Sequence, residues 1–150
     1  MSDELRNPSL SELAFLIGDW DMTLSRAAFL PDQDAEVHGR VEVRAIEEGG
    51  LLAMRQVVER SGPPAATWVI GRDEALAGYT ALYTDNRGVS RVYEMTVAGA
   101  EWRMWRNNPE FSQRFDATVS SERDEIVGEW QKRSSAGDWE HDFDVRYTRL

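Results

Sequence analysis

The stretch "GYTALYTDNRGVSRVYEMTVAGAEWRMWR", residues 78–106, decides the fold of this 150-residue chain. Its apolar and polar residues alternate, which is the pattern of β-strands with one buried face. Two turn signals divide the stretch into three strands, namely "DNRG" at 85–88 and "AG" at 98–99. Asp85 suits the first position of a type I turn, and Gly88 suits the left-handed position that follows it. The stretch therefore predicts a meander of three antiparallel strands.

The length of each turn sets which residues face each other across neighbouring strands. "DNRG" places Tyr83 opposite Arg91, and a two-residue turn at 98–99 places Arg91 opposite Arg106. By the same reasoning, "NNPE" (107–110) places Arg106 opposite Phe111, and "SSAG" (134–137) places Trp130 opposite His141. The predicted inward face comprises Tyr79, Tyr83, Arg91, Tyr93, Met95, Trp102, Met104, Arg106, Phe111, Gln113, Phe115, Trp130, His141 and Phe143.

Turn signals recur about every twelve residues along the rest of the chain, and they separate ten predicted strands. An open sheet of ten strands would leave two exposed edges, whereas the first and last strands of an even number can pair. We therefore predict one all-β domain over residues 1–150, a closed ten-stranded antiparallel up-and-down barrel, with a sandwich as the alternative. A short helix, capped by Ser9 or Ser11 and ended by Gly18, is predicted to plug one end, with an apolar stripe of Leu10, Leu13, Ala14 and Ile17.

Composition narrows the classes of partner. The net charge of -10 argues against nucleic acids and anionic membrane surfaces, since both select a basic protein surface. The absence of cysteine excludes disulfides and thiolate catalysis. The first residues, "MSDEL", carry acids where a signal peptide carries bases, and no apolar run reaches the length of a membrane span. We expect a cytoplasmic protein, either a monomer or a homodimer, with a small molecule as its partner.

Two short motifs lie at opposite ends of the chain. "GDW" (18–20) follows the predicted helix, and "YTR" (147–149) lies at the end of the last strand. With ten strands between these motifs, the sequence resembles the calycins, which include lipocalins, fatty-acid-binding proteins and nitrobindin-like domains. More closely, it resembles bacterial lipocalin-like domains of unknown function. The resemblance implies that Arg149 packs on Trp20 at the closed end of a barrel, as a cation over an indole ring.

The polar residues of the predicted inward face gather at the other end. Successive loops of a meander alternate between the two ends, so Tyr83, Arg91, Arg106 and His141 are expected at one mouth beneath the loop 26–33. Two facing guanidinium groups need a counter-charge, and the predicted registers place no acid nearby. A bound anion would supply it; alternatively, both side chains reach out to solvent. The predicted ligand-binding residues are Arg91, Arg106, His141, Tyr83, Tyr93, Met104, Phe111 and Gln113.

Three roles remain open for His141. It can be a buried histidine bonded to Gln113, to a tyrosine or to water, or it can contact a ligand or act as a general base. The third role is that of a haem ligand, which the resemblance to nitrobindin-like domains implies, because their haem histidine also lies on a late strand. Those domains begin with a glycine-rich pattern, whereas this chain has Met22 and Leu24 at the glycine positions. Two histidines and no cysteine argue against a zinc site, so no cofactor is expected apart from haem.

Three functions follow from these observations. The first is non-enzymatic binding of a small amphipathic ligand, with an anionic group, inside the barrel. The second is haem binding or barrel catalysis through His141. The third is an interaction protein that binds no ligand, because side chains such as Trp102, Met104 and Phe115 fill its barrel.

Overall fold

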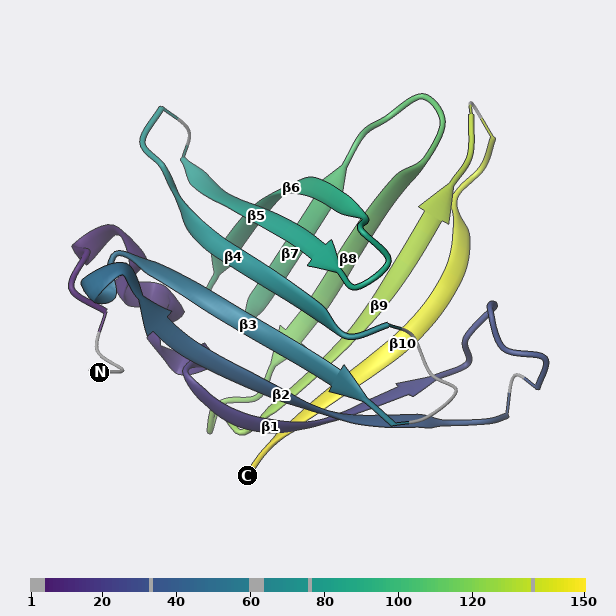
Figure 1. The fold of residues 1–150 in the computed structure, drawn as a ribbon, viewed down its shortest axis with the longest axis horizontal. Helices are drawn as coiled ribbons and strands as arrows, with labels where there is room; N and C mark the ends of the chain where they lie inside the picture. Colours follow the sequence, from purple (N-terminus) through teal and green to yellow (C-terminus); the bar gives the residue numbers. More distant parts are fainter. Residues whose placement is uncertain (1–4, 33, 60–63, 76, 136) are drawn as a thin grey trace.

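The computed structural model describes residues 5–32, 34–59, 64–75, 77–135 and 137–150. Within these ranges the chain forms ten antiparallel strands, each paired with the next in sequence, and β1 pairs with β10 to close the barrel (Figure 1). The predicted all-β closed barrel is therefore confirmed. The strands are β1 (Gly18–Ser25), β2 (Val37–Ile46), β3 (Leu51–Val58), β4 (Ala66–Asp73), β5 (Gly78–Asp85), β6 (Ser90–Ala98), β7 (Glu101–Arg106), β8 (Ser112–Val119), β9 (Glu125–Arg133) and β10 (Glu140–Arg149).

Two 3-10 helices accompany the strands in the described part of the chain: η1 (Pro8–Leu16), before β1, and η2 (Glu47–Gly49), between β2 and β3. The side chain of Asn7 caps η1 by accepting a hydrogen bond from the Ser9 amide at 3.0 Å, so the predicted caps Ser9 and Ser11 are wrong. A 3-10 helix returns to the same face every three residues, not along an α-helical stripe. Its buried residues follow that period and are Leu10, Leu13 and Leu16. No helix in the described ranges has the length and apolar character needed to cross a membrane.

The registers observed for the β5–β6 and β6–β7 hairpins agree in part with those predicted from the sequence. Tyr83 pairs with Arg91 across the "DNRG" turn, as predicted. In the next hairpin the turn residues are 99–100, because Gly99 takes the first turn position with φ of 60°. The register moves by two residues, so the predicted pairing of Arg91 with Arg106 is wrong. A shift of two keeps every side chain on its predicted face.

The hairpin at 107–111 moves in the same way. Arg106 pairs with Gln113, two residues beyond the predicted register, and Phe111 lies just before β8. Met104 pairs with Phe115, and both side chains are buried. The inward face predicted for these two strands is therefore kept, although the pairs within it differ.

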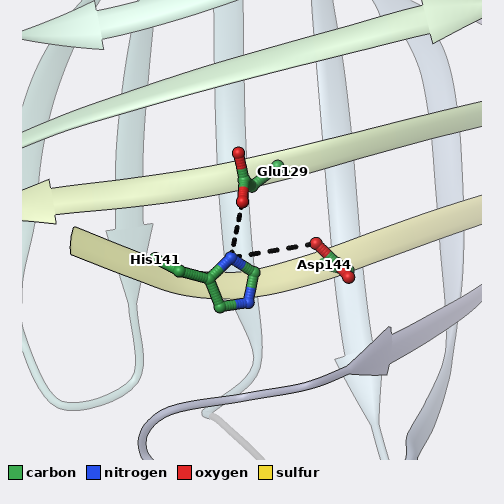
Figure 2. A group of neighbouring side chains, drawn as sticks. All are labelled: Glu129, His141 and Asp144. Carbon is green, nitrogen blue, oxygen red and sulfur yellow. Dashed lines mark hydrogen bonds and ion pairs between the residues drawn. The ribbon is translucent and has the colours of Figure 1, made fainter. Parts of the chain in front are cut away.

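A β-bulge in β10 reverses the predicted alternation near the open end. Trp130 pairs with Phe143 and not with His141, because the register shifts between His141 and Phe143. The extra residue turns Asp142 inward, where it is 7% exposed, and turns His141 outward. Figure 2 shows the His141 ring directed toward Glu129 on the adjacent strand. The predicted inward orientation of His141 is thus wrong, since a one-residue insertion moves a side chain to the opposite face.

The closed end depends on the contact between the first and last strands. Trp20 pairs with Arg149, and the guanidinium carbon lies 4.2 Å from the centre of the indole ring. The indole nitrogen donates to the carbonyl of Leu16 at 2.9 Å, while the guanidinium donates to the carbonyls of Phe15 and Ile17. This arrangement satisfies backbone carbonyls at the end of η1 and binds the helix over the barrel. The packing of Arg149 on Trp20 is the contact that the resemblance implies.

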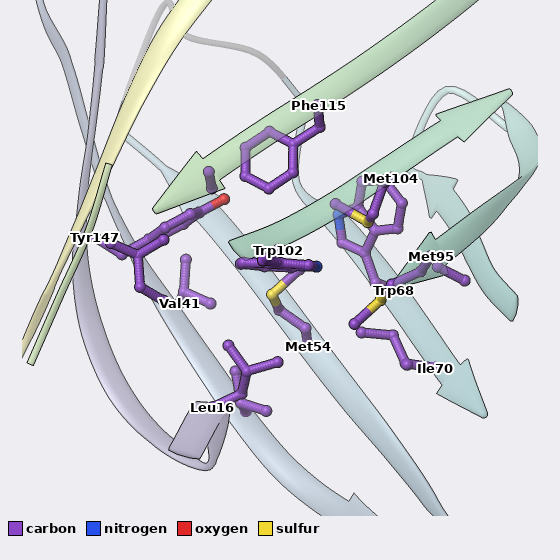
Figure 3. Packing of buried hydrophobic residues seen from close by; sticks show 14 of the residues in the cluster. Leu16, Val41, Met54, Trp68, Ile70, Met95, Trp102, Met104, Phe115 and Tyr147 are labelled. Atoms are coloured by element: carbon purple, nitrogen blue, oxygen red, sulfur yellow. The ribbon is translucent and has the colours of Figure 1, made fainter. Parts of the chain in front are cut away.

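The core fills the half of the barrel next to η1. Trp102 and Phe115 meet edge to face with ring centres 5.0 Å apart, among the aliphatic and sulfur-containing side chains labelled in Figure 3. Phe115 also crosses the backbone of β9 at Gly128, where an added Cβ would lie 2.6 Å from its ring. Glycine at that position therefore permits the close approach of the aromatic ring to the strand.

Replacement of Trp20 by alanine should lower the free energy of unfolding by about 3–5 kcal/mol, because it removes a buried indole and leaves Arg149 without its aromatic partner. Trp105 is a matched control, since it lies next to buried Met104 and faces outward. Trp105→Ala should cost clearly less. Denaturant unfolding of both variants tests this, and equal losses would contradict the role given to the closed end.

Candidate functional site

The open half of the barrel holds a cavity of about 490 Å³. This volume lies within the range of pockets that bind small molecules. The side chains that fill the closed half, such as Trp102 and Phe115, do not line the cavity. The barrel is therefore filled only in part, which argues against the interaction protein with a fully filled barrel.

Six of the eight residues predicted to bind a ligand line this cavity, and they are Tyr83, Arg91, Tyr93, Met104, Phe111 and Gln113. Arg106 and His141 are not among the lining residues. The Nε of Arg106 donates to the carbonyl of Phe111 at 3.2 Å, which holds the arginine against the loop after β7. The cavity thus contains one of the two arginines expected at its mouth.

Aromatic side chains form one continuous wall of the cavity. Trp68 lies 5.0 Å from Tyr83, 5.1 Å from Tyr93 and 6.1 Å from Trp130, measured between ring centres. Phe143 extends the wall, with its ring centre 6.2 Å from that of Trp130. Trp68 was missed by the sequence reasoning, although its place on β4 gives it the same inward alternation as buried Ala66 and Ile70. These stacked and edge-on rings offer a large apolar surface to a ligand.

The polar groups deep in the cavity are satisfied by one another. Gln56 accepts a hydrogen bond from the Trp68 indole at 3.3 Å and donates one to the Tyr147 hydroxyl at 3.3 Å. The Tyr93 hydroxyl donates to Gln113. Burial raises the pKa of Tyr147 and of Tyr93, so both phenols stay neutral. These groups brace the wall and leave few free donors or acceptors at depth.

The two arginines at the mouth differ in their partners. Arg87 forms an ion pair with Asp85 at 2.7 Å, and this pairing holds the pKa of the Asp85 carboxyl well below its usual range. Asp85 also accepts from the Tyr83 hydroxyl at 2.7 Å, and burial raises the pKa of Tyr83 to about 12. The guanidinium of Arg91 instead lies 5.0 Å from the ring centre of Phe111 and makes no ion pair with any residue that the structure describes. Arg91 is therefore a cavity-lining cation with an unmatched charge.

The bulge adds an acid that the predicted registers did not contain. Asp142 lines the cavity, and its carboxylate lies 3.8 Å from the Lys132 ammonium group. Burial raises the pKa of Asp142, while the charges of Lys132 and His141 act in the opposite direction. In a regular strand Asp142 would face outward together with Asp144, two residues later. The inward orientation of Asp142 therefore depends on the bulge, which the alternation of the sequence does not predict.

His141 lies outside the cavity and contacts the segment after β1, part of which lines the cavity. Figure 2 shows its Nδ1 facing the carboxylates of Glu129 and Asp144. Its Nδ1 is 2.6 Å from the Glu129 carboxylate, and its Nε2 is 3.0 Å from the carbonyl of Arg26. The Arg26 guanidinium donates to Asp144 at 2.5 Å. The residues that follow, 27–30, include Phe29 and Leu30 of the cavity lining. The ion pairs around His141 thus fasten one edge of the cavity mouth.

Two cofactor hypotheses can be tested on this geometry. Glu129, His141 and Asp144 offer ligand atoms within 4.8 Å of one another, but Arg26 already matches the charge of Asp144 and both ring nitrogens of His141 have partners. We therefore describe the three residues as an ion-pair network. His38, the second histidine, is exposed on the outer face and lies 3.3 Å from the Thr23 hydroxyl. With both histidines outside the cavity, the residues do not fit haem binding or cavity catalysis through His141.

The barrel is similar in fold to Rv2717c from M. tuberculosis. The two structures superpose with a TM-score of 0.71 over 98% of this chain and 99% of that chain, at 14% sequence identity. Likeness at this identity shows a shared β-barrel fold and no more. No protein-family model matches the chain, and a search of curated proteins also finds no match.

His141→Ala should loosen the segment after β1, because it removes the contacts to Glu129 and to the Arg26 carbonyl. We expect hydrogen exchange of the Ala28 amide, which bonds to the Asp142 carbonyl at 2.7 Å, to accelerate about tenfold or more. His38→Ala, which alters an exposed histidine on β2, is the control and should leave that amide unchanged. Equal exchange in the two variants would show that His141 does not hold the segment.

The raised pKa of Asp142 has a consequence for stability. As pH rises above the ordinary aspartate value of 3.8, the unfolded chain gives up this proton before the folded one does, so ionisation of Asp142 destabilises the fold. The Asp142→Asn variant has no ionisable group at this position, so it escapes this destabilisation. The free energy of unfolding of the variant relative to wild type should therefore increase as pH rises from about 4 toward neutrality. Denaturant unfolding across this range measures the difference, and a constant or decreasing value would contradict burial as the main cause.

Proposed function

We propose that the barrel binds a small amphipathic molecule in its open half, with an acidic group of the ligand at Arg91. The observation that carries this proposal is an aromatic-lined cavity with a guanidinium in its lining that makes no ion pair with any described residue. Guanidinium groups bind carboxylates and phosphates through two parallel hydrogen bonds. The Arg91 side chain therefore has the chemistry for an anionic headgroup.

The rest of the lining supports the same orientation. The apolar part of a ligand would lie against Trp68 and Trp130, where the deeper polar groups already bond to one another. Arg91 and Phe111 belong to the strands and loops at the open end, next to solvent. A molecule would thus enter with its apolar part first and keep its charged group near the mouth.

The charge of the protein makes this site specific. At a net charge of -10, most of the surface repels anions. Arg91 in a cavity is a local exception, and a low-dielectric wall strengthens its attraction for a counter-ion. A binding protein for an anionic amphiphile fits this arrangement, because the lining combines a continuous aromatic wall with the Arg91 guanidinium.

Arg91→Met should weaken the binding of an acidic ligand by about 1.5–3 kcal/mol, the range for hydrogen bonds to charged groups. Isothermal titration with dodecanoate, dodecyl phosphate and a neutral dodecanol probe measures the change. The acidic probes should lose affinity in the variant, while dodecanol should bind both proteins alike.

Arg103→Met is the matched control, because Arg103 lies on the outer face of β7 and pairs with Glu101 and Asp116. It should leave the affinities of all three probes unchanged. Failure of both acidic probes to bind the wild type, or an equal loss in the two variants, would refute the anion site at Arg91.

A further inference from the structure

A second group in the cavity lacks the partners that its chemistry requires. Asp142 is 7% exposed, yet no residue that the structure describes donates a hydrogen bond to its carboxylate oxygens. The nearest cation, the Lys132 ammonium, lies 3.8 Å away, which is too far for a hydrogen bond. An ionised carboxylate offers about four acceptor sites, so most of the hydrogen-bonding capacity of Asp142 faces the cavity.

The backbone holds Asp142 in this orientation. The bulge between His141 and Phe143 points the residue inward, and the Asp142 carbonyl accepts from the Ala28 amide at 2.7 Å. On the outer side, His141 is held by Glu129 and by the Arg26 carbonyl. Several contacts therefore stabilise a conformation that buries a carboxylate, although burial without hydrogen bonds is unfavourable. Bulges often direct a side chain in this way beside a functional site.

We propose that the natural ligand carries a neutral hydrogen-bond donor, a hydroxyl or an amide N–H, that binds Asp142 while its acidic group binds Arg91. This inference rests on the proposed function and specifies the class of ligand. It predicts a hydroxylated or amide-containing amphiphilic acid in place of a plain fatty acid.

The cations around the carboxylate explain why the donor is neutral. Lys132 lies next to Asp142, and Arg91 lines the same cavity, so an ammonium group on the ligand would face two like charges. Arg91, Tyr93 and Asp142 all line the same cavity of about 490 Å³. The acid-binding and donor-binding groups are therefore close enough for one small molecule to contact both.

The test compares dodecanoate with monohydroxylated isomers that carry the hydroxyl near the carboxylate, at mid-chain or at the terminal carbon. Isothermal titration should show that at least one isomer binds the wild type about tenfold or more tightly than dodecanoate does. Asp142→Asn should remove most of that preference and leave the affinity for dodecanoate unchanged or higher. Arg91→Met should weaken dodecanoate and the preferred isomer by the same factor.

Asp116→Asn is the control, because Asp116 is an exposed aspartate on the outer face of β8. It should keep the full preference for the hydroxylated isomer. If all isomers bind the wild type no better than dodecanoate, or if Asp142→Asn keeps the preference, the inference about Asp142 is wrong while the proposed function stands. If neither dodecanoate nor any isomer binds the wild type, both are wrong.

Discussion

The pairing of β10 with β1 is the interaction on which the rest of the structure depends. It closes the sheet, so that its first and last strands present no unpaired edge. It also brings Trp20 and Arg149, residues far apart in sequence, into one contact at the end covered by η1. The same strand reaches the opposite end of the barrel, where its bulge shapes the cavity. One strand thus carries both the structural end and the candidate functional end of the molecule.

The bulge in β10 decides which of two adjacent titratable residues, His141 or Asp142, faces the cavity. Without the extra residue, His141 would face the cavity and Asp142 would face solvent. With it, the titratable imidazole joins an outer ion-pair network, and a carboxylate enters a cavity that already contains Arg91 and Lys132. The electrostatics of the cavity follow from this single irregularity. The sequence predicted a cluster of cationic side chains at the mouth, whereas the cavity lining contains an aspartate among its cations.

Most of the fold could be predicted from the sequence, because alternation and turn residues act locally. The "DNRG" turn gave the pairing of Tyr83 with Arg91, and the parity of the inward residues survived two errors of register. The first error arose because Gly99 occupies the first and not the second position of its turn. The second arose because the connection after β7 extends beyond "NNPE", so that Phe111 lies before the start of β8. Both shifts were even, so six of the eight predicted site residues still line the cavity.

His141 and Asp142 could not be placed from local pattern, because the stretch "WEHDFDVRYTRL" (139–150) alternates without interruption. A bulge leaves no mark when the residues on both sides of it fit either face. The contacts that favour it are tertiary: the Ala28 amide bonds to Asp142, and the Arg26 carbonyl bonds to His141. Both partners precede β10 by more than a hundred residues, beyond the reach of any turn or alternation rule.

The division of the barrel into a filled half and a hollow half determines how a ligand would bind. Trp102 and Phe115 occupy the centre near η1, and Gly128 allows that close packing. A ligand therefore cannot pass through the barrel, and its apolar part must end against the wall around Trp68 and Trp130. Its polar atoms must then lie at the level of Arg91 and Asp142, near the mouth. Under the proposed function, the depth of the core would position the polar groups of the ligand, and selectivity would arise from which donors and acceptors the ligand carries at that depth.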